Sequence, residues 1–210
     1  MHIEPGLLAA AKIAAADVVA LGLVGGAAWL ALQRPALLLR SALAAAFFTL
    51  CMQSFFLKVG PSELHFVGAM PMVLVLGLVP TLLGFAVGLL LQGLLFEPAD
   101  LLHLSVNTLS LAMPLLAVHA ALGRQLARID LRAVLRLDAA YYAGVTAMVG
   151  FWLSIGEGAT PVSEWARFAA SYLAVVALEP IITVAVLFGV RRWRDQRWAA
   201  WCFDPRAAVH

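Results

Sequence analysis

The first two residues of the chain, Met1 and His2, have the chemistry of a metal chelate, and a further histidine, His65, lies in a later loop. The Met1 amine, the His2 backbone amide and the His2 imidazole can bind one ion in two fused rings. The imidazole of His65 would complete a planar set of four nitrogens. Such a field suits Ni(II) or Cu(II), and with some strain Co(II). The alternative is that His2 is an ordinary second residue without a ligand role.

The composition of the chain is that of a protein embedded in a membrane. Of 210 residues, 63% are hydrophobic and only 12% are charged, and the mean hydropathy is +0.94. A soluble domain is about 45–50% apolar and about 25% charged. The two cysteines, Cys51 and Cys202, are too far apart in the sequence to suggest a disulfide framework or a cysteine metal site. The sequence therefore predicts an all-α integral membrane protein.

The apolar runs predict seven transmembrane helices. They cover about 7–32, 41–57, 66–79, 81–96, 104–123, 138–156 and 166–190. A helix needs about 20 apolar residues to cross a bilayer, so we expect the shorter runs to be tilted or buried within the bundle. Residues 1–190 then form one transmembrane domain, and residues 191–210 form a basic, aromatic tail.

The distribution of arginine predicts the orientation. Arg34 and Arg40 follow the first run, four arginines follow the fifth, and five lie in the tail. These segments share one side in the seven-helix arrangement. By the positive-inside rule, the C-terminus is cytoplasmic and the N-terminus is outside.

This orientation places Met1, His2 and His65 on the same, outer face. Acidic residues are expected on that face too, among them Glu63 and Asp100. Acidic groups at the mouth of a site raise the local cation concentration, so Glu63 and Asp100 are candidates for guiding an ion inward. They can equally be ordinary loop acids.

Several short motifs occur in an order that resembles the CbiM/NikM family, the membrane subunits that capture cobalt or nickel for energy-coupling-factor transporters. The resemblance extends from residue 1 to about residue 190. Its motifs are Met1-His2-Ile3 with Gly6, His65-Phe66-Val67-Gly68, Leu76-Gly77-Leu78-Val79-Pro80, Leu91-Gln92-Gly93-Leu94-Leu95-Phe96, Asn107 with Met113, and Leu178-Glu179-Pro180-Ile181-Ile182-Thr183.

The resemblance implies the same metal ligands as the chemistry of the residues: Met1, His2 and His65. Polar groups inside a bilayer are costly and often functional, so Asn107 and Glu179 are candidates for supporting roles around the site. Asn107 could orient His65 or its loop, or simply bond a neighbouring helix. Glu179 could hold the site region in place, or bond backbone groups freed by Pro180.

The resemblance also implies a function and a set of partners. The chain would bind Co²⁺ or Ni²⁺ at the outer face of a bacterial or archaeal cytoplasmic membrane, for import. A transmembrane coupling subunit, ATPase subunits and a small accessory membrane subunit would be its partners. We expect no catalysis, because the sequence has no glycine-rich Lys-Ser/Thr phosphate loop. The alternative is a vitamin-capturing subunit, or another small-solute transporter without a metal site.

Overall fold

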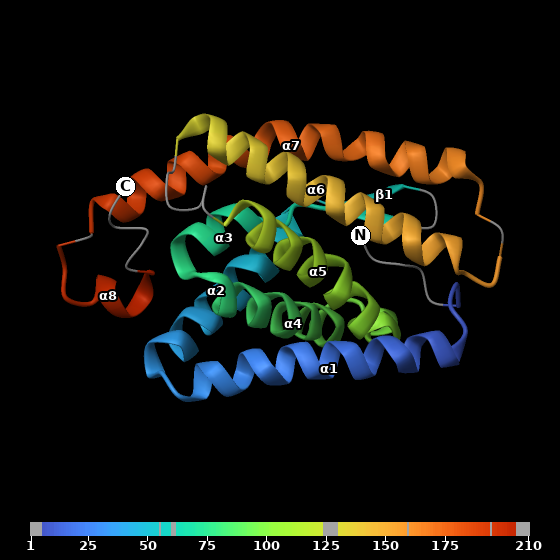
Figure 1. The fold of residues 1–210 in the computed structure, drawn as a ribbon, viewed down its shortest axis with the longest axis horizontal. Coiled ribbons are helices and arrows are strands. Elements are labelled where there is room, and N and C mark those ends of the chain that lie inside the picture. Colours follow the sequence, from blue (N-terminus) through green and yellow to red (C-terminus); the bar gives the residue numbers. More distant parts are fainter. Residues whose placement is uncertain are drawn as a thin grey trace.

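The computed structural model describes residues 6–54, 56–59, 62–123, 130–158, 160–193 and 195–204. It is a bundle of helices that run along one long axis (Figure 1). The long helices are α1 (Ala10–Leu32), α2 (Pro35–Ser54), α4 (Leu78–Leu95), α5 (Leu104–Leu122), α6 (Leu131–Ser154) and α7 (Val162–Arg191). Shorter elements are the strands β1 (Phe56–Val59) and β2 (Ser62–His65), α3 (Ala69–Leu76), the 3-10 helix η1 (Pro98–His103) and α8 (Ala199–Cys202).

The helical membrane fold expected from the sequence is confirmed. In the described residues, α1, α2, α4, η1 with α5, and α7 are each long and apolar enough to cross a membrane. The 24 residues of α6 extend about 36 Å at 1.5 Å per residue, which also exceeds the hydrocarbon thickness.

The third apolar run differs from a regular span. Helix α3 has 8 residues, all of them buried, and is therefore only about 12 Å long. Gly68 precedes it with a φ of 66°, and Gly77 ends it with a φ of 98°. These left-handed conformations favour glycine and interrupt the helix. The irregular backbone before α3 is tolerated at this depth because protein surrounds it on all sides.

The helices form two groups around α3. Helices α1, α2 and α4 lie together on one side of Figure 1, with α6 and α7 on the other and α5 between them. Gly84 and Gly88 of α4 allow the closest approach to α2, since a Cβ at these positions would meet Ala44 and Phe48. A Gly-x-x-x-Gly spacing commonly permits such contacts between membrane helices.

Candidate metal centre

His65 ends strand β2 and lies in a fixed position inside the protein. The two strands form an antiparallel hairpin with Phe56 opposite His65, directly after the end of α2. The side chain of His65 is 4% exposed. Its Nδ1 is 3.3 Å from the carbonyl oxygen of Met52, and its Nε2 is 3.2 Å from Oε2 of Glu63.

These contacts determine which nitrogen of His65 is available to a metal. When Nδ1–H donates to the Met52 carbonyl, the lone pair of the ring lies on Nε2. A backbone carbonyl bonded to the other ring nitrogen is the usual arrangement around histidine ligands, because it fixes both the tautomer and the ring plane. In this tautomer Nε2 is the nitrogen that can bind an ion, and the ion would take the place of the contact that Nε2 makes with Oε2 of Glu63.

A cavity of ≈ 350 Å³ lies next to this histidine. Its described lining residues come from the end of α2, from β2 and from the end of α4: Met52, Gln53, Glu63, His65, Gln92, Leu95, Phe96 and Glu97. Of the two acids expected at the mouth of the site, Glu63 belongs to this lining. Asp100 lies in η1 and is not among these residues, and neither is Asn107.

Glu179 holds the start of α3, the helix that follows the His65 loop. The amide of Met70 donates to Oε1 of Glu179 at 3.1 Å. The backbone amides of Gly68 and Ala69 also interact favourably with the Glu179 carboxylate. A carboxylate at a helix N-terminus satisfies amides that have no partner within the helix. The hydrogen bond from Met70 places Glu179 beside the segment that follows His65, and its supporting role for the site stays a prediction.

Tyr142 is a further residue of this arrangement and was missed by the sequence analysis. Its hydroxyl donates to Oε2 of Glu179, and its side chain is 1% exposed. Buried tyrosines in a helix that faces the bundle resemble ordinary core residues in a sequence. Only the preceding Asp138 and the polar Glu179 mark this layer as unusual.

Asn107 lies in the first turn of α5 and is 1% exposed. It is thus an intramembrane polar residue inside the bundle, as expected from the sequence. Its proposed hydrogen bond to His65 or to the loop stays a prediction.

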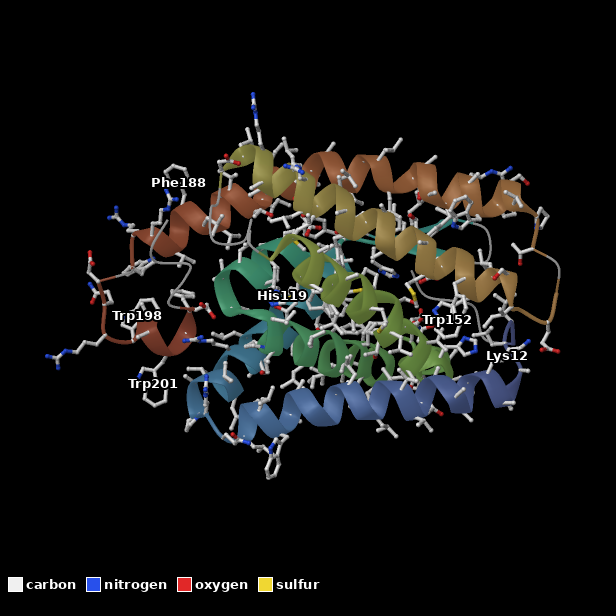
Figure 2. All side chains as sticks on the ribbon, in the orientation of Figure 1. Lys12, His119, Trp152, Phe188, Trp198 and Trp201 are labelled. Carbon is white, nitrogen blue, oxygen red and sulfur yellow. The ribbon has the colours of Figure 1, made fainter. Side chains whose placement is uncertain are left out.

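Met1 and His2 lie outside the described residues, but the chain just after them is anchored. The amide of Glu157 donates to the carbonyl of Leu7 at 2.8 Å. The ammonium group of Lys12 donates to the carbonyl of Ile155 at 2.6 Å and pairs with Glu157 at 3.0 Å. In Figure 2, Lys12 and Trp152 lie at the same end of the bundle. The connection between α6 and α7 therefore fixes the N-terminal segment at its first described residues.

The described residues do not form a complete metal site by themselves. Among them, no group of three or more His, Cys, Asp or Glu side chains could hold an ion. His65 thus needs ligands from outside this part of the chain if it binds a metal in a high-affinity site.

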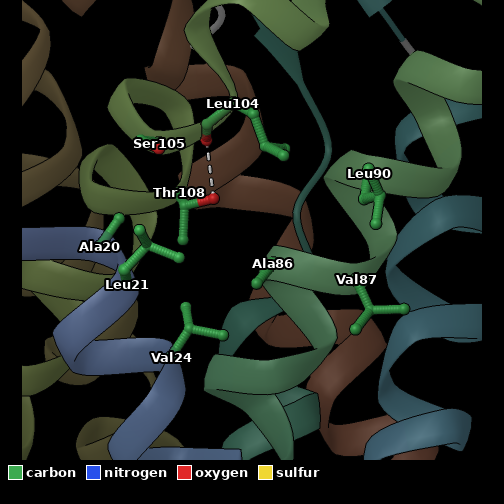
Figure 3. Close-up of a pocket in the computed structure, with 9 residues that line it drawn as sticks. All are labelled: Ala20, Leu21, Val24, Ala86, Val87, Leu90, Leu104, Ser105 and Thr108. Atoms are coloured by element: carbon green, nitrogen blue, oxygen red, sulfur yellow. Dashed lines mark hydrogen bonds between the residues drawn. The ribbon is translucent and has the colours of Figure 1, made fainter. Parts of the chain in front are cut away.

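Two other cavities are apolar. One of ≈ 210 Å³ lies between α1, α4 and α5 (Figure 3), and the hydroxyl of Thr108 in its lining donates to the carbonyl of Leu104 at 2.7 Å. The other, of ≈ 460 Å³, lies between α2 and α7 and is lined by residues such as Phe47, Phe66 and Ile182. Neither offers the ligands of a metal site.

The chain was compared with known proteins. A family model described as CbiM, the cobalt uptake substrate-specific transmembrane region, matches residues 2–197. A solved structure described as the crystal structure of a transition metal transporter shares the fold, with a TM-score of 0.74 over 94% of this chain and 95% of that chain, at 19% sequence identity. No curated protein sequence matches the chain.

Proposed function

Since this chain belongs to the CbiM family of cobalt-uptake transmembrane proteins, we propose that it captures Co²⁺ or Ni²⁺ at the outer face of the membrane for import. Four nitrogens bind the ion: the Met1 amine, the amide and imidazole nitrogens of His2, and Nε2 of His65. Membership of the family makes the chain a multi-pass membrane protein of metal uptake. The ligand set and the choice of metal belong to the proposal.

The buried and oriented ring of His65 carries this proposal. A histidine whose Nδ1 is held by a backbone carbonyl and whose Nε2 borders a cavity is prepared to receive an ion. A freely rotating ring would lose conformational entropy when it binds the ion, and this ring is already held in place. The α6–α7 connection anchors Leu7 and Lys12 in the same way, at the first described residues after this segment.

The nitrogen ligands give selectivity through geometry. A planar field of four nitrogens, one of them a deprotonated amide, favours ions with a tetragonal preference over Mg²⁺ and Ca²⁺, which take oxygen ligands. Because the amide must lose its proton and the imidazoles must be neutral, binding weakens as the pH falls.

Transport requires partners in this proposal. An ion bound at the outer face does not cross the bilayer unaided, and the sequence has no nucleotide-binding loop. A coupling subunit in the membrane, ATPase subunits and a small accessory membrane subunit, as the family resemblance implies, supply the driving force. In liposomes, ATP-dependent uptake of Ni²⁺ or Co²⁺ should therefore require these subunits in addition to this chain.

A titration of the purified, C-terminally tagged protein with Ni(II) and with Co(II) tests the capture site. We expect one-to-one binding, and the tighter ion identifies the substrate. Loss of a nitrogen ligand should lower the metal affinity by more than the 10–100-fold that is typical when a group supporting a ligand is removed. His2→Ala, His65→Ala and a version with one residue added before Met1 should each therefore weaken binding by more than about 100-fold.

The matched control is His119→Ala, which removes a histidine from α5, outside the described lining of the cavity. Its affinity should equal that of the unmodified protein. Equal binding by the His2 and His65 variants would contradict the chelate, because both would then be absent from the site.

A further inference from the structure

The cavity beside His65 has a second wall, whose residues lie outside the hairpin in the sequence. This wall is formed by the end of α4, from Gln92 to Glu97. The amides of Phe96 and Glu97 both donate to the carbonyl of Gln92, at 2.9 and 3.2 Å. These bonds end the helix beside the cavity, so that the side chains of Gln92 and Glu97 border the same space as Glu63 and His65.

Burial of Gln92 in this position is energetically unfavourable. The residue is 3% exposed, and its Oε1 accepts no hydrogen bond from the part of the chain that the structure describes. A buried polar atom without a partner costs about 1–3 kcal/mol, and such atoms in native proteins usually meet water or a ligand. Because Gln92 lines the cavity, its oxygen is available to an occupant of that space.

Besides His65 and Gln53, the polar groups around the cavity are oxygen donors, and two of them are carboxylates. Glu63 and Glu97 contribute carboxylates, and Gln92 contributes an amide oxygen. Oxygen donors of this kind attract hard, hydrated divalent cations rather than anions or apolar solutes. They differ in this from the nitrogen set proposed for the capture site.

The arrangement suits an ion that keeps its water shell. Among the described residues, His65 and the two carboxylates do not form a group of three that could hold a metal ion directly. A cavity of ≈ 350 Å³ nevertheless has room for an ion with its first waters, since each water takes about 30 Å³. Waters of the shell can donate to the carboxylates and to Oε1 of Gln92.

We propose that Gln92, Glu97 and Glu63 form a waiting site, in which a hydrated divalent cation is held through its waters before it is transferred to the nitrogen ligands. This inference rests on the proposed capture function and adds the step that precedes it. Glu63 links the two sites, because its carboxylate lies in the cavity and also contacts Nε2 of His65 at 3.2 Å. The ion then loses its waters next to the ligands that replace them.

The kinetics of Ni²⁺ binding distinguish a waiting site from a ligand. A group that only assists passage lowers the association and dissociation rates by the same factor when it is removed. Glu97→Gln and Gln92→Leu should therefore slow both rates by about 10-fold, a factor within the range for charged clefts, and leave Kd unchanged. Stopped-flow association and chelator-induced release measure the two rates.

The matched control is Glu164→Gln, which removes a carboxylate from the first turn of α7 that pairs with Arg167. It should leave both rates unchanged. Unchanged rates in Glu97→Gln, an exposed position where misfolding is not a concern, would overturn the waiting site. A raised Kd with an unchanged association rate would overturn it too, because the residue would then act on the bound state.

A second measurement keeps the waiting site apart from the capture site. In His65→Ala, hydrated Mn²⁺ should still bind weakly, as detected by loss of its free electron paramagnetic resonance signal. Adding Glu97→Gln to this variant should abolish the weak binding. Equal Mn²⁺ binding with and without Glu97 would contradict the waiting site, whatever the titrations with Ni(II) and Co(II) show about the chelate.

Discussion

Glu179 and Tyr142 join α7 and α6 through one buried hydrogen bond. The second oxygen of Glu179 accepts the amide of Met70, so that one carboxylate connects three helices. A hydrogen bond of this kind, shielded from water, is costly to break because it leaves a polar partner unsatisfied. One acidic side chain therefore helps to position the start of α3, and with it the end of the His65 loop.

Removal of the Tyr142 hydroxyl tests this dependence. Tyr142→Phe should lower the free energy of unfolding by about 1–3 kcal/mol, since Oε2 of Glu179 loses its donor. Glu179→Leu should lower the free energy of unfolding further, because the amides at the start of α3 also lose their acceptor. Thermal unfolding in detergent measures both effects.

Tyr141 provides the matched control. It is fully buried, but its hydroxyl has no hydrogen-bond partner among the described residues. Tyr141→Phe should therefore leave the stability unchanged or raise it. An equal loss of stability in the two tyrosine variants would show that ring packing, and not the bond to Glu179, explains the effect.

The sequence identified the costly polar residues but not their partners. His65 was predicted as a ligand from the chelating chemistry of Met1 and His2 and from the family resemblance, and Glu179 was singled out as a polar group in an apolar span. Tyr142 and Gln92 received no role, since an aromatic residue or a glutamine near a helix end is common in membrane proteins. Their roles depend on which side chains meet in space, and a single sequence does not contain that information.

At the scale of elements, α3 shows that a continuous apolar run can contain interruptions of the helix. The run 66–79 predicts a short span by hydropathy. Its helical part is limited by Gly68 and Gly77, which have positive φ angles and also lack room for a side chain. A Cβ on Gly68 would lie 2.6 Å from the ring of Phe47, and one on Gly77 would lie 2.9 Å from Oδ2 of Asp204.

Gly68→Ala should therefore destabilise the protein by more than the roughly 1 kcal/mol expected of a left-handed residue alone, because Phe47 must also move. Gly22→Ala in α1 is the matched control, since its Cβ would meet nothing within 4 Å. In a helix this exchange should stabilise by about 0.5–1 kcal/mol. If both variants unfold at the same temperature, the close contact with Phe47 does not exist.

At the scale of the whole molecule, the C-terminal segment is attached to the end of the bundle. Arg40, counted in the sequence as a positive charge of a loop, is 5% exposed. Its guanidinium donates to the carbonyls of Trp201 and Ala200 at 3.1 and 2.8 Å and lies 3.7 Å from Oδ2 of Asp204. Figure 2 shows Trp198 and Trp201 at the opposite end of the molecule from Lys12. The predicted separation of a domain at 1–190 from a tail at 191–210 stays a prediction.

Loss of Arg40 should release this segment. In Arg40→Gln, the half-buried thiol of Cys202 should react with maleimide several times faster than in the unmodified protein. The buried thiol of Cys51 serves as an internal reference, and mass spectrometry distinguishes the two. Arg34→Gln, at an exposed position of the same region, should not change the rate at Cys202. An unchanged rate in Arg40→Gln would mean that the segment is held by other contacts.

Helix α3 is held at both ends by acidic residues from distant parts of the chain. Glu179 takes the amides at its start. At its other end the amide of Asp204 donates to the carbonyl of Val75 at 2.7 Å. This helix of 8 residues therefore connects the His65 loop with the C-terminal segment. Because close-packed interiors transmit strain, a displacement of the C-terminal segment should also shift the His65 loop.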